Sequence, residues 1–150
     1  MMGIVDDFRD QGLAIFGPTK LAAQLEGSKA FCKDFLHRNN IPTAFYKTFT
    51  EVEKAKLYVK EQGTPIVIKA DGLAAGKCII IANTLQEAVN TIDDMLEGNR
   101  FGDAGSRVVI EEFLVGEEAS FIVMVDGSNI LPMATSQDHK ARDNDDKGPN

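Results

Sequence analysis

The hydrophobic residues of the chain follow helical spacing in some segments and strand-like spacing in others, which indicates a mixed α/β or α+β fold. Apolar positions three and four residues apart predict helices over residues 1–12, 20–25, 29–38, 51–62 and 85–96. A hydroxyl residue precedes each of the last three, and its oxygen can accept a hydrogen bond from the first helical turn. Ser28, Thr50 and Thr84 are therefore predicted to cap these helices.

Short β-branched and aromatic runs predict the strands. They cover residues 13–16, 43–49, 66–68, 79–81, 107–113, 119–125 and 129–134. The runs 66–68 and 79–81 lie on either side of a glycine-containing turn, so we expect an antiparallel hairpin. Asp126-Gly127 is typical of a hairpin turn and should join the last two strands. The chain is polar from residue 135 onward, and we expect a loop there.

The first 18 residues are typical of one helix-and-strand step of a larger sheet. One helix cannot cover both faces of the predicted strand 13–16, so we expect this strand to belong to the edge of a parallel sheet whose other strands are absent from the chain. An adventitious N-terminal arm is the alternative interpretation.

Composition and charge narrow the classes of function. The 150 residues are 43% hydrophobic, which suits one ordinary domain or two small lobes. The net charge of -7 argues against a general nucleic-acid or anionic-membrane binder. No apolar run approaches the roughly 20 residues of a membrane-spanning helix. Cys32 and Cys78 match no metal-ligand spacing, and the N-terminus does not resemble a secretory signal, so we expect a cytoplasmic protein.

The turn between the runs 66–68 and 79–81 contains the first candidate site. It combines small residues and lysines, namely Lys69, Gly72, Gly76 and Lys77. Accessible backbone amides and ammonium groups suit the oxygens of a phosphate. The turn is not the P-loop motif, because Cys78 and a strand follow where that motif has Ser or Thr and a helix. A tight turn with solvated lysines is the alternative.

Acidic residues around the predicted strand 107–113 form the second candidate site. Its members are Glu111, Glu112, Phe113, Leu114 and Glu118. Carboxylates accept hydrogen bonds from sugar hydroxyls or an exocyclic amine, and the backbone beside Phe113 and Leu114 can offer a donor and an acceptor to a purine edge. For Glu112 and Glu117 the alternative is solvation of an edge strand.

The polar run 135–142 is the third candidate. His139, Lys140 and Arg142 lie within four residues in it, directly after Asp138, and this basic cluster suits a phosphate or a developing oxyanion. A charged surface loop is the alternative interpretation.

Four segments, residues 17–31, 66–77, 110–121 and 131–140, closely resemble the phosphoribosylamine–glycine ligase family, and the resemblance spans essentially the whole chain. It implies an incomplete ATP-grasp fold and the use of ATP and Mg²⁺. It also implies that glycine is activated as glycyl phosphate and joined to 5-phosphoribosylamine, which gives glycinamide ribonucleotide in purine biosynthesis. Small molecules, and neither nucleic acid nor a membrane, are then the expected partners.

The resemblance also implies roles for single residues. Lys29 and Lys69 match lysines directed at the nucleotide phosphates, and residues 72–77 match a lid loop over them. Residues 111–114 match the segment that meets the adenine, and Glu118, two residues before Ser120, matches a ribose ligand. Asp138, His139, Lys140 and Arg142 match residues close to the reacting phosphate and the substrates.

The chain departs from the family in two ways. Cys78 stands where the family has a second glycine in Gly-Lys-Gly. Family chains are also roughly 2.5 to 3 times longer, as expected of several domains. We therefore expect a remnant of an N-terminal domain over residues 1–18, a helical part over 19–44, a lid subdomain over 45–115 and the start of a second subdomain over 116–150.

This length predicts that the chain alone does not complete the reaction. The magnesium ligands are expected outside it, and no metal ligand is predicted within it. A non-catalytic nucleotide-binding module and a structural remnant of the ligase are the alternatives. Apolar edges at residues 13–16 and 121–125 predict a tendency to self-associate.

Overall fold

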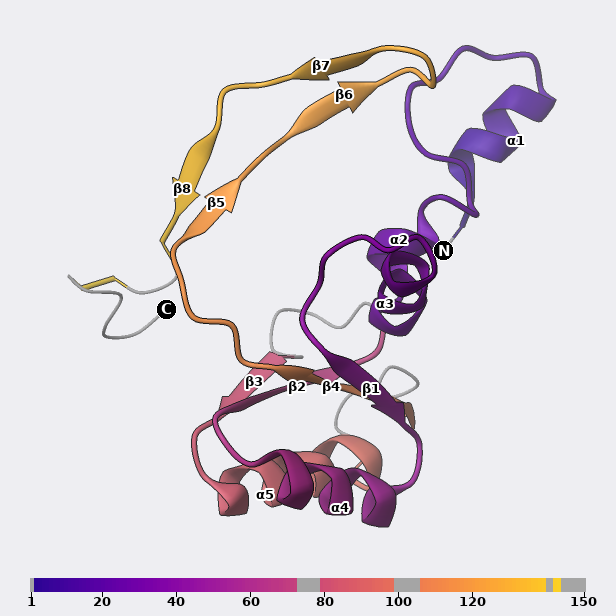
Figure 1. The fold of residues 1–150 in the computed structure, drawn as a ribbon. Helices are drawn as coiled ribbons and strands as arrows, with labels where there is room; N and C mark the ends of the chain where they lie inside the picture. The colour runs from indigo at the N-terminus through magenta and orange to yellow at the C-terminus, as the bar shows by residue number, and fades with distance from the viewer. Residues whose placement is uncertain (1, 73–78, 99–105, 140–141, 144–150) are drawn as a thin grey trace. The chain divides into compact units, whose positions relative to one another are not determined.

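A computed structural model describes residues 2–72, 79–98, 106–139 and 142–143 of the chain (Figure 1). The chain forms two compact units, Met1–Phe113 and Leu114–Asn150. These units do not decide the four-segment division predicted from the sequence, which stays a prediction. No helix in the described ranges is long and apolar enough to cross a membrane.

The first unit mixes helices and strands, as the hydrophobic pattern predicts. Its described helices are α1 (Ile4–Asp10), α2 (Gln24–Gly27), α3 (Lys29–Arg38), α4 (Val52–Gln62) and α5 (Leu85–Leu96). Its described strands are β1 (Tyr46–Phe49), β2 (Ile66–Ala70), β3 (Ile79–Ala82) and β4 (Val108–Glu112). The four strands form one sheet in the order β1-β4-β2-β3, and every neighbouring pair is antiparallel.

One face of this sheet packs against α4 and α5 and forms the core (Figure 1). Side chains alternate between the two faces of a strand, so every second residue of β2 points into the core. The fully buried side chains include Ile68, Val108 and Ile110 from the sheet and Val59 and Ile92 from the helices.

The other face of the sheet carries the polar residues that matter for the candidate site. Directly opposed residues of antiparallel strands share a face, so the register places on it Tyr46, Thr48, Val67, Lys69, Ile79, Ile81, Val109 and Glu111. Helix α3 contacts this face on the side of β1 and β4, through Lys33 and Asp34. At β3, Ile79 and Ile81 remain about half exposed.

The second unit consists of two nested antiparallel strand pairs. β5 (Glu118–Ser120) pairs with β8 (Ser136–Asp138), and β6 (Val123–Val125) pairs with β7 (Ile130–Pro132). Asp126 closes the inner turn, because its carboxylate accepts hydrogen bonds from the backbone N–H groups of Ser128 and Asn129 at 3.0 and 2.8 Å. The predicted hairpin turn is therefore confirmed.

Two local predictions were confirmed at the level of single hydrogen bonds. Ser28 caps α3 by accepting from the N–H of Phe31 at 3.1 Å. Thr84 caps α5 in a capping box, in which its side chain accepts from the N–H of Glu87 and the Glu87 carboxylate accepts from the N–H of Thr84. The predicted hairpin is the β2–β3 pair.

Other local predictions were wrong for identifiable reasons. Thr50 does not cap α4, whose N-cap is Glu51 without a side-chain cap bond. Residues 13–16 form no strand, since no described strand pairs with them, and Leu13 and Phe16 are exposed. The predicted strand 119–125 is divided into β5 and β6, and the predicted loop after residue 135 contains β8. Pairing with β5 supplies the hydrogen bonds that make the polar segment Ser136–Asp138 a strand.

The Thr84 capping box predicts a measurable stability difference between two threonine variants. Thr84→Ala should lower the free energy of unfolding by about 1 kcal/mol, because the N–H of Glu87 in the first turn of α5 loses its acceptor, Thr84 Oγ1. Thr50→Ala is the matched control and should change it by less than about 0.5 kcal/mol. Urea unfolding followed by circular dichroism measures both, and equal losses would contradict this account of the caps.

Candidate functional site

Asp71 lies directly after β2 and joins three segments of the first unit. Its Oδ1 accepts hydrogen bonds from Ser28 Oγ at 3.0 Å and from the Ala30 N–H at 3.1 Å, so it caps α3 together with Ser28. Its Oδ2 accepts from the Arg107 guanidinium, with Nε at 2.7 Å, just before β4. Only 6% of Asp71 is exposed. This carboxylate therefore fixes the start of α3 against the ends of two strands.

The contacts of Asp71 also determine its protonation. Burial by itself raises the pKa of this carboxyl. Hydrogen bonds from the Ala30 N–H, from Arg107 and from Ser28, together with the charge of Arg107, outweigh burial and hold the pKa of Asp71 below its ordinary value. Asp71 is thus a stable anion at neutral pH.

Lys29 is placed by this junction, since it lies between Ser28 and Ala30. Its Nζ donates a hydrogen bond to the carbonyl oxygen of Gly72 at 3.0 Å. The structure therefore brings together two of the residues predicted to contact phosphates, Lys29 and Gly72. Gly76 and Lys77, the other predicted residues of this turn, lie outside the described residues.

Glu111 on β4 is a buried acid shared by two lysines. Its Oε2 lies 2.9 Å from Lys33 Nζ and 3.0 Å from Lys69 Nζ. Its other oxygen, Oε1, is buried and has no hydrogen-bond partner among the described residues. The group has one negative and two positive charges, so it can attract an anion.

An apolar surface adjoins this charged group on the same face of the sheet. Ile79 of β3 is directly opposite Lys69, and Ile81 is directly opposite Val67. Ile79 and Ile81 are 53% and 50% exposed. A ligand with a flat apolar ring and a negatively charged group would match both parts of this surface.

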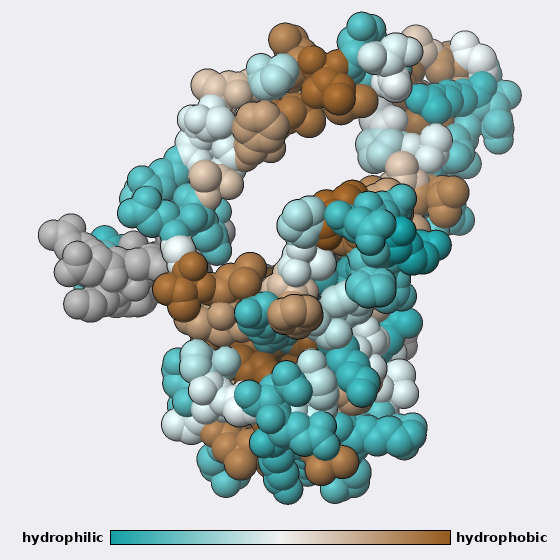
Figure 2. Space-filling model, in the orientation of Figure 1, coloured by the Kyte–Doolittle hydropathy of each residue, from teal (hydrophilic) through white to brown (hydrophobic). Residues whose placement is uncertain are grey.

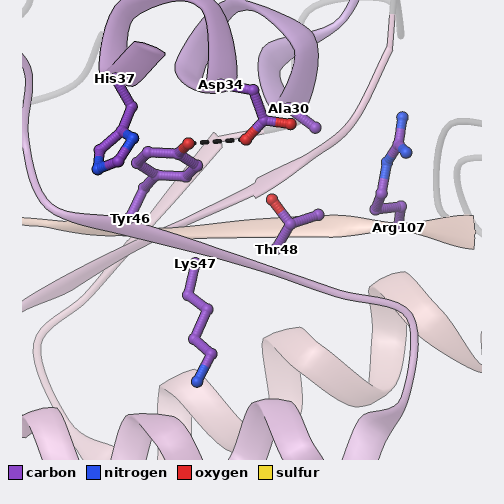
Figure 3. A pocket seen from close by; sticks show the side chains of 7 residues that line it. All are labelled: Ala30, Asp34, His37, Tyr46, Lys47, Thr48 and Arg107. Atoms are coloured by element: carbon purple, nitrogen blue, oxygen red, sulfur yellow. Dashed lines mark hydrogen bonds between the residues drawn. The ribbon is translucent and has the colours of Figure 1, made fainter. Parts of the chain in front are cut away.

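A separate pocket of about 350 Å³ lies between α3 and β1 (Figure 3). Tyr46 donates a hydrogen bond to Asp34 Oδ1 at 2.7 Å in it. Burial, this hydrogen bond and the charge of Asp34 raise the pKa of Tyr46 to about 12. The pocket lining, which is Ala30, Asp34, His37, Tyr46, Lys47, Thr48 and Arg107, contains none of the residues predicted to bind a ligand.

The remaining residues predicted to meet a purine base are not gathered on one face. Glu112 is on the face opposite Glu111, and its carboxylate accepts from the Phe45 N–H at 3.3 Å. Phe113, half-buried, ends the first unit. Leu114 begins the second unit and is 64% exposed.

The second unit brings together two more predicted residues. Glu118 of β5 is directly opposite Asp138 of β8. His139 follows β8 and is exposed, and Arg142 pairs with Asp143 through Nε at 2.8 Å. Lys140 lies outside the described residues.

Sequence reasoning missed Asp71, Arg107 and Lys33 as members of this site. Lys33 follows Lys29 by four residues, so a helical projection places both on one face of α3, and this signal could have found it. No local pattern links Asp71 to Arg107, because they meet only when β2 and β4 pair.

Comparison with models of protein families shows which family the chain belongs to. The family model of the phosphoribosylglycinamide synthetase ATP-grasp (A) domain matches residues 27–150. The chain belongs to this family. The resemblance stated from the sequence motifs and the ATP-grasp fold class are thereby confirmed.

Relatives of this ATP-grasp domain agree in sequence and in fold. The chain is 71% identical over 150 residues to phosphoribosylamine–glycine ligase from Vibrio parahaemolyticus. The matched region covers 100% of this chain and 35% of that protein. The crystal structure of phosphoribosylamine–glycine ligase from Thermotoga maritima is 35% identical, with a TM-score of 0.80 over 90% of this chain and 34% of that one. The chain thus spans about a third of the length of these relatives.

A more distant ATP-grasp structure shares only the fold. It is the biotin carboxylase domain of Hydrogenobacter thermophilus 2-oxoglutarate carboxylase, in complex with MgADP, ADP and bicarbonate. The sequences are 24% identical, and the TM-score is 0.73 over 91% of this chain and 31% of that one. Among the described residues of the present ATP-grasp domain, no group of three or more His, Cys, Asp or Glu side chains could hold a metal ion.

Asp71 predicts a specific pH dependence of stability. Its pKa is lowered in the folded state, so its contribution is present at neutral pH and is lost as pH falls through the folded pKa. Asp71→Asn should lower the free energy of unfolding by roughly 2 kcal/mol at pH 7, and the gap to the wild type should narrow below about pH 4. Urea unfolding at pH values from about 3 to about 7, which include the ordinary pKa range of carboxyl groups, measures this difference in stability.

Asp10→Asn, at the exposed end of α1, is the matched control and should change the free energy of unfolding very little throughout this pH range. A gap between wild type and Asp71→Asn that stays constant down to the lowest pH would contradict the account of Asp71.

Proposed function

We propose that the chain supplies the nucleotide-binding part of a phosphoribosylamine–glycine ligase. The observation that carries this proposal is the Lys33–Glu111–Lys69 group beside the exposed apolar surface of β3, in a chain that is 71% identical to a protein of that name. The reaction proposed for the whole protein joins glycine to 5-phosphoribosylamine with ATP and gives glycinamide ribonucleotide, ADP and phosphate in purine biosynthesis. The proposed location is the cytoplasm.

The residues of the first unit fit a nucleotide. Lys69 and Lys29 would neutralise phosphate oxygens, and the backbone after Gly72, with Gly76 and Lys77, would cover them. Ile79 and Ile81 would pack against the adenine, and Glu111 would hold Lys69 in place through their 3.0 Å ion pair.

The other proposed nucleotide contacts rest on the sequence motifs rather than on contacts within the first unit. The backbone of Phe113 and Leu114 would meet the purine edge, and Glu112 would remain at the rim, because its side chain is on the other face. Glu118 would accept hydrogen bonds from the ribose hydroxyls. These assignments are supported by the motif match and by the acceptor chemistry of carboxylates.

The chemistry of the reaction explains why such residues are needed. A carboxylate is a poor acyl donor until one of its oxygens becomes a good leaving group, and ATP supplies that group by phosphorylating glycine to glycyl phosphate. The protein has to position the reactants and neutralise negative charge. Asp138, His139, Lys140 and Arg142 are proposed to lie near the reacting phosphate and the substrates.

Magnesium is proposed as a cofactor of the whole protein. The described residues contain no group of three or more His, Cys, Asp or Glu that could hold a metal ion, and the magnesium ligands are proposed to lie in the rest of the protein. The chain alone is therefore proposed to bind ATP without completing the ligation. A non-catalytic nucleotide-binding module is the second candidate, and it is favoured by the fact that the chain spans 35% of the length of its relative.

ATP binding to the isolated chain tests the proposal. We expect isothermal titration to give a Kd of about 1 mM or tighter, and Lys69→Met should weaken it roughly tenfold, because one charge-assisted contact to a phosphate is lost. Lys60→Met is the matched control, since Lys60 is exposed on α4 and the substitution removes the same charge. Undetectable binding by a folded chain, or equal loss in both variants, would contradict the nucleotide site.

The same samples test whether the chain catalyses the reaction by itself. We expect no phosphate release when glycine and 5-phosphoribosylamine are added with ATP and Mg²⁺ to the chain alone. Release that depends on both substrates would show that the chain catalyses the reaction by itself, contrary to the proposal.

Self-association is a second proposal, and it concerns the strand pair β6–β7. Figure 2 shows hydrophobic residues gathered on this pair. Its exposed apolar residues are Val123, Met124, Val125, Ile130 and Leu131, with Phe121, Ile122 and Met133 beside it. An isolated two-stranded pair is only marginally stable in water. An exposed apolar patch on it favours association with another apolar surface.

Light scattering of the purified chain tests this second proposal. We expect an average mass greater than that of one chain at high concentration, and Leu131→Glu should shift it toward the monomer by placing a charge in the patch. Ser128→Glu is the matched control, since it adds the same charge at the turn outside the patch. A monomeric wild type at all concentrations would refute the proposal.

A further inference from the structure

Lys33 is a buried lysine that was not among the residues predicted to contact the nucleotide. It lies on α3, one turn after Lys29, and only 9% of the residue is exposed. A lysine is rarely buried to this extent unless its charge is paired, so its partners indicate what it does.

The ammonium group of Lys33 is fully used by the protein. It lies 2.9 Å from Glu111 Oε2, donates to Thr43 Oγ1 at 2.7 Å and reaches the Ala44 carbonyl oxygen at 3.4 Å. It also lies 5.7 Å from the centroid of the Tyr46 ring. Three acceptors match the three N–H donors of an ammonium group. Lys33 therefore has no donor left for a ligand.

Lys69 has the opposite character, although it contacts the same carboxylate oxygen. Its Nζ lies 3.0 Å from Glu111 Oε2, which is its one hydrogen-bond acceptor within the described part of the chain. Its side chain is 23% exposed, against 11% for Lys33. Two N–H donors of Lys69 thus have no acceptor among the described residues, at the more accessible end of the group.

We propose that Lys33 is a positioning residue of the nucleotide site, which pairs with Glu111 so that Lys69 stays available to a phosphate. The inference rests on the proposed nucleotide site and adds to it the control of one contact. One carboxylate cannot neutralise two ammonium groups, so the excess positive charge resides at the exposed lysine. Without Lys33, Glu111 would pair with Lys69 alone, and a phosphate would have to compete with a buried carboxylate.

The first test needs no nucleotide. Brief acetylation of the chain with acetic anhydride, followed by proteolysis and mass spectrometry, gives the modification rate of each lysine. We expect Lys33 to be modified at least about tenfold more slowly than Lys69 in the wild type, since its three donors are held. In Lys33→Met, modification of Lys69 should slow by roughly tenfold, as one charge-assisted hydrogen bond now holds it alone.

A double variant separates positioning from a general structural effect. In Lys33→Met/Glu111→Gln the carboxylate that captures Lys69 is gone, and the modification rate of Lys69 should return to the wild-type value. Lys60 serves as the internal reference, because it is exposed on α4. An unchanged Lys69 rate in Lys33→Met, or no recovery in the double variant, would overturn the proposal. If the variants do not fold, equal rates for Lys33 and Lys69 in the wild type would overturn it as well.

The second test uses adenosine and ATP as probes, titrated into each variant. In Lys33→Met the ratio of ATP affinity to adenosine affinity should fall roughly tenfold, and in the double variant it should recover. Equal losses for both ligands, without recovery, would assign Lys33 a merely structural role. Failure of the wild type to bind ATP would instead refute the proposed nucleotide site, whereas the acetylation rates would still decide whether Lys33 frees Lys69.

Discussion

The first unit depends on a single buried carboxylate, that of Asp71. An anion with so little exposure is tolerated only when its oxygens are hydrogen-bonded and its charge is balanced. The N-terminus of α3, Ser28 and Arg107 together meet this requirement. These groups come from segments far apart in the chain, so satisfying one side chain fixes the start of α3 against the sheet.

The candidate site follows from that arrangement and from the two faces of the sheet. Lys29 lies in the first turn of α3, and Lys69 lies two residues before Asp71 on β2, so both lysines have fixed positions relative to the same anion. Strand alternation turns Ile68 into the core and Lys69 to the other face. A slip of one residue in the pairing of β2 would exchange them and bury Lys69 among apolar side chains.

Much of the fold could be predicted because its determinants are local. The capping residues Ser28 and Thr84 precede apolar helical patterns, and the β2–β3 hairpin has two β-branched runs around a turn. Lys69 was predicted from the lysines and small residues around the turn and Lys29 from the family motifs, and both assignments stay predictions. Local patterns failed where pairing decides the outcome: β8 is a strand because β5 lies beside it, and residues 13–16 have no strand beside them within the described ranges. The Asp71–Arg107 ion pair escaped prediction for the same reason.

The pairing of β1 with β4 has a consequence for the order in which the structure can form. Strands β6 and β7 are joined by a short turn, and the β5–β8 pair encloses them, so the second unit needs only contacts between near neighbours in the chain. Tyr46, in contrast, pairs with Glu111, and the sheet cannot close until the chain between them has been made. During synthesis Lys33 and Lys69 therefore leave the ribosome without their shared carboxylate, and the charged group is assembled only when β4 enters the sheet.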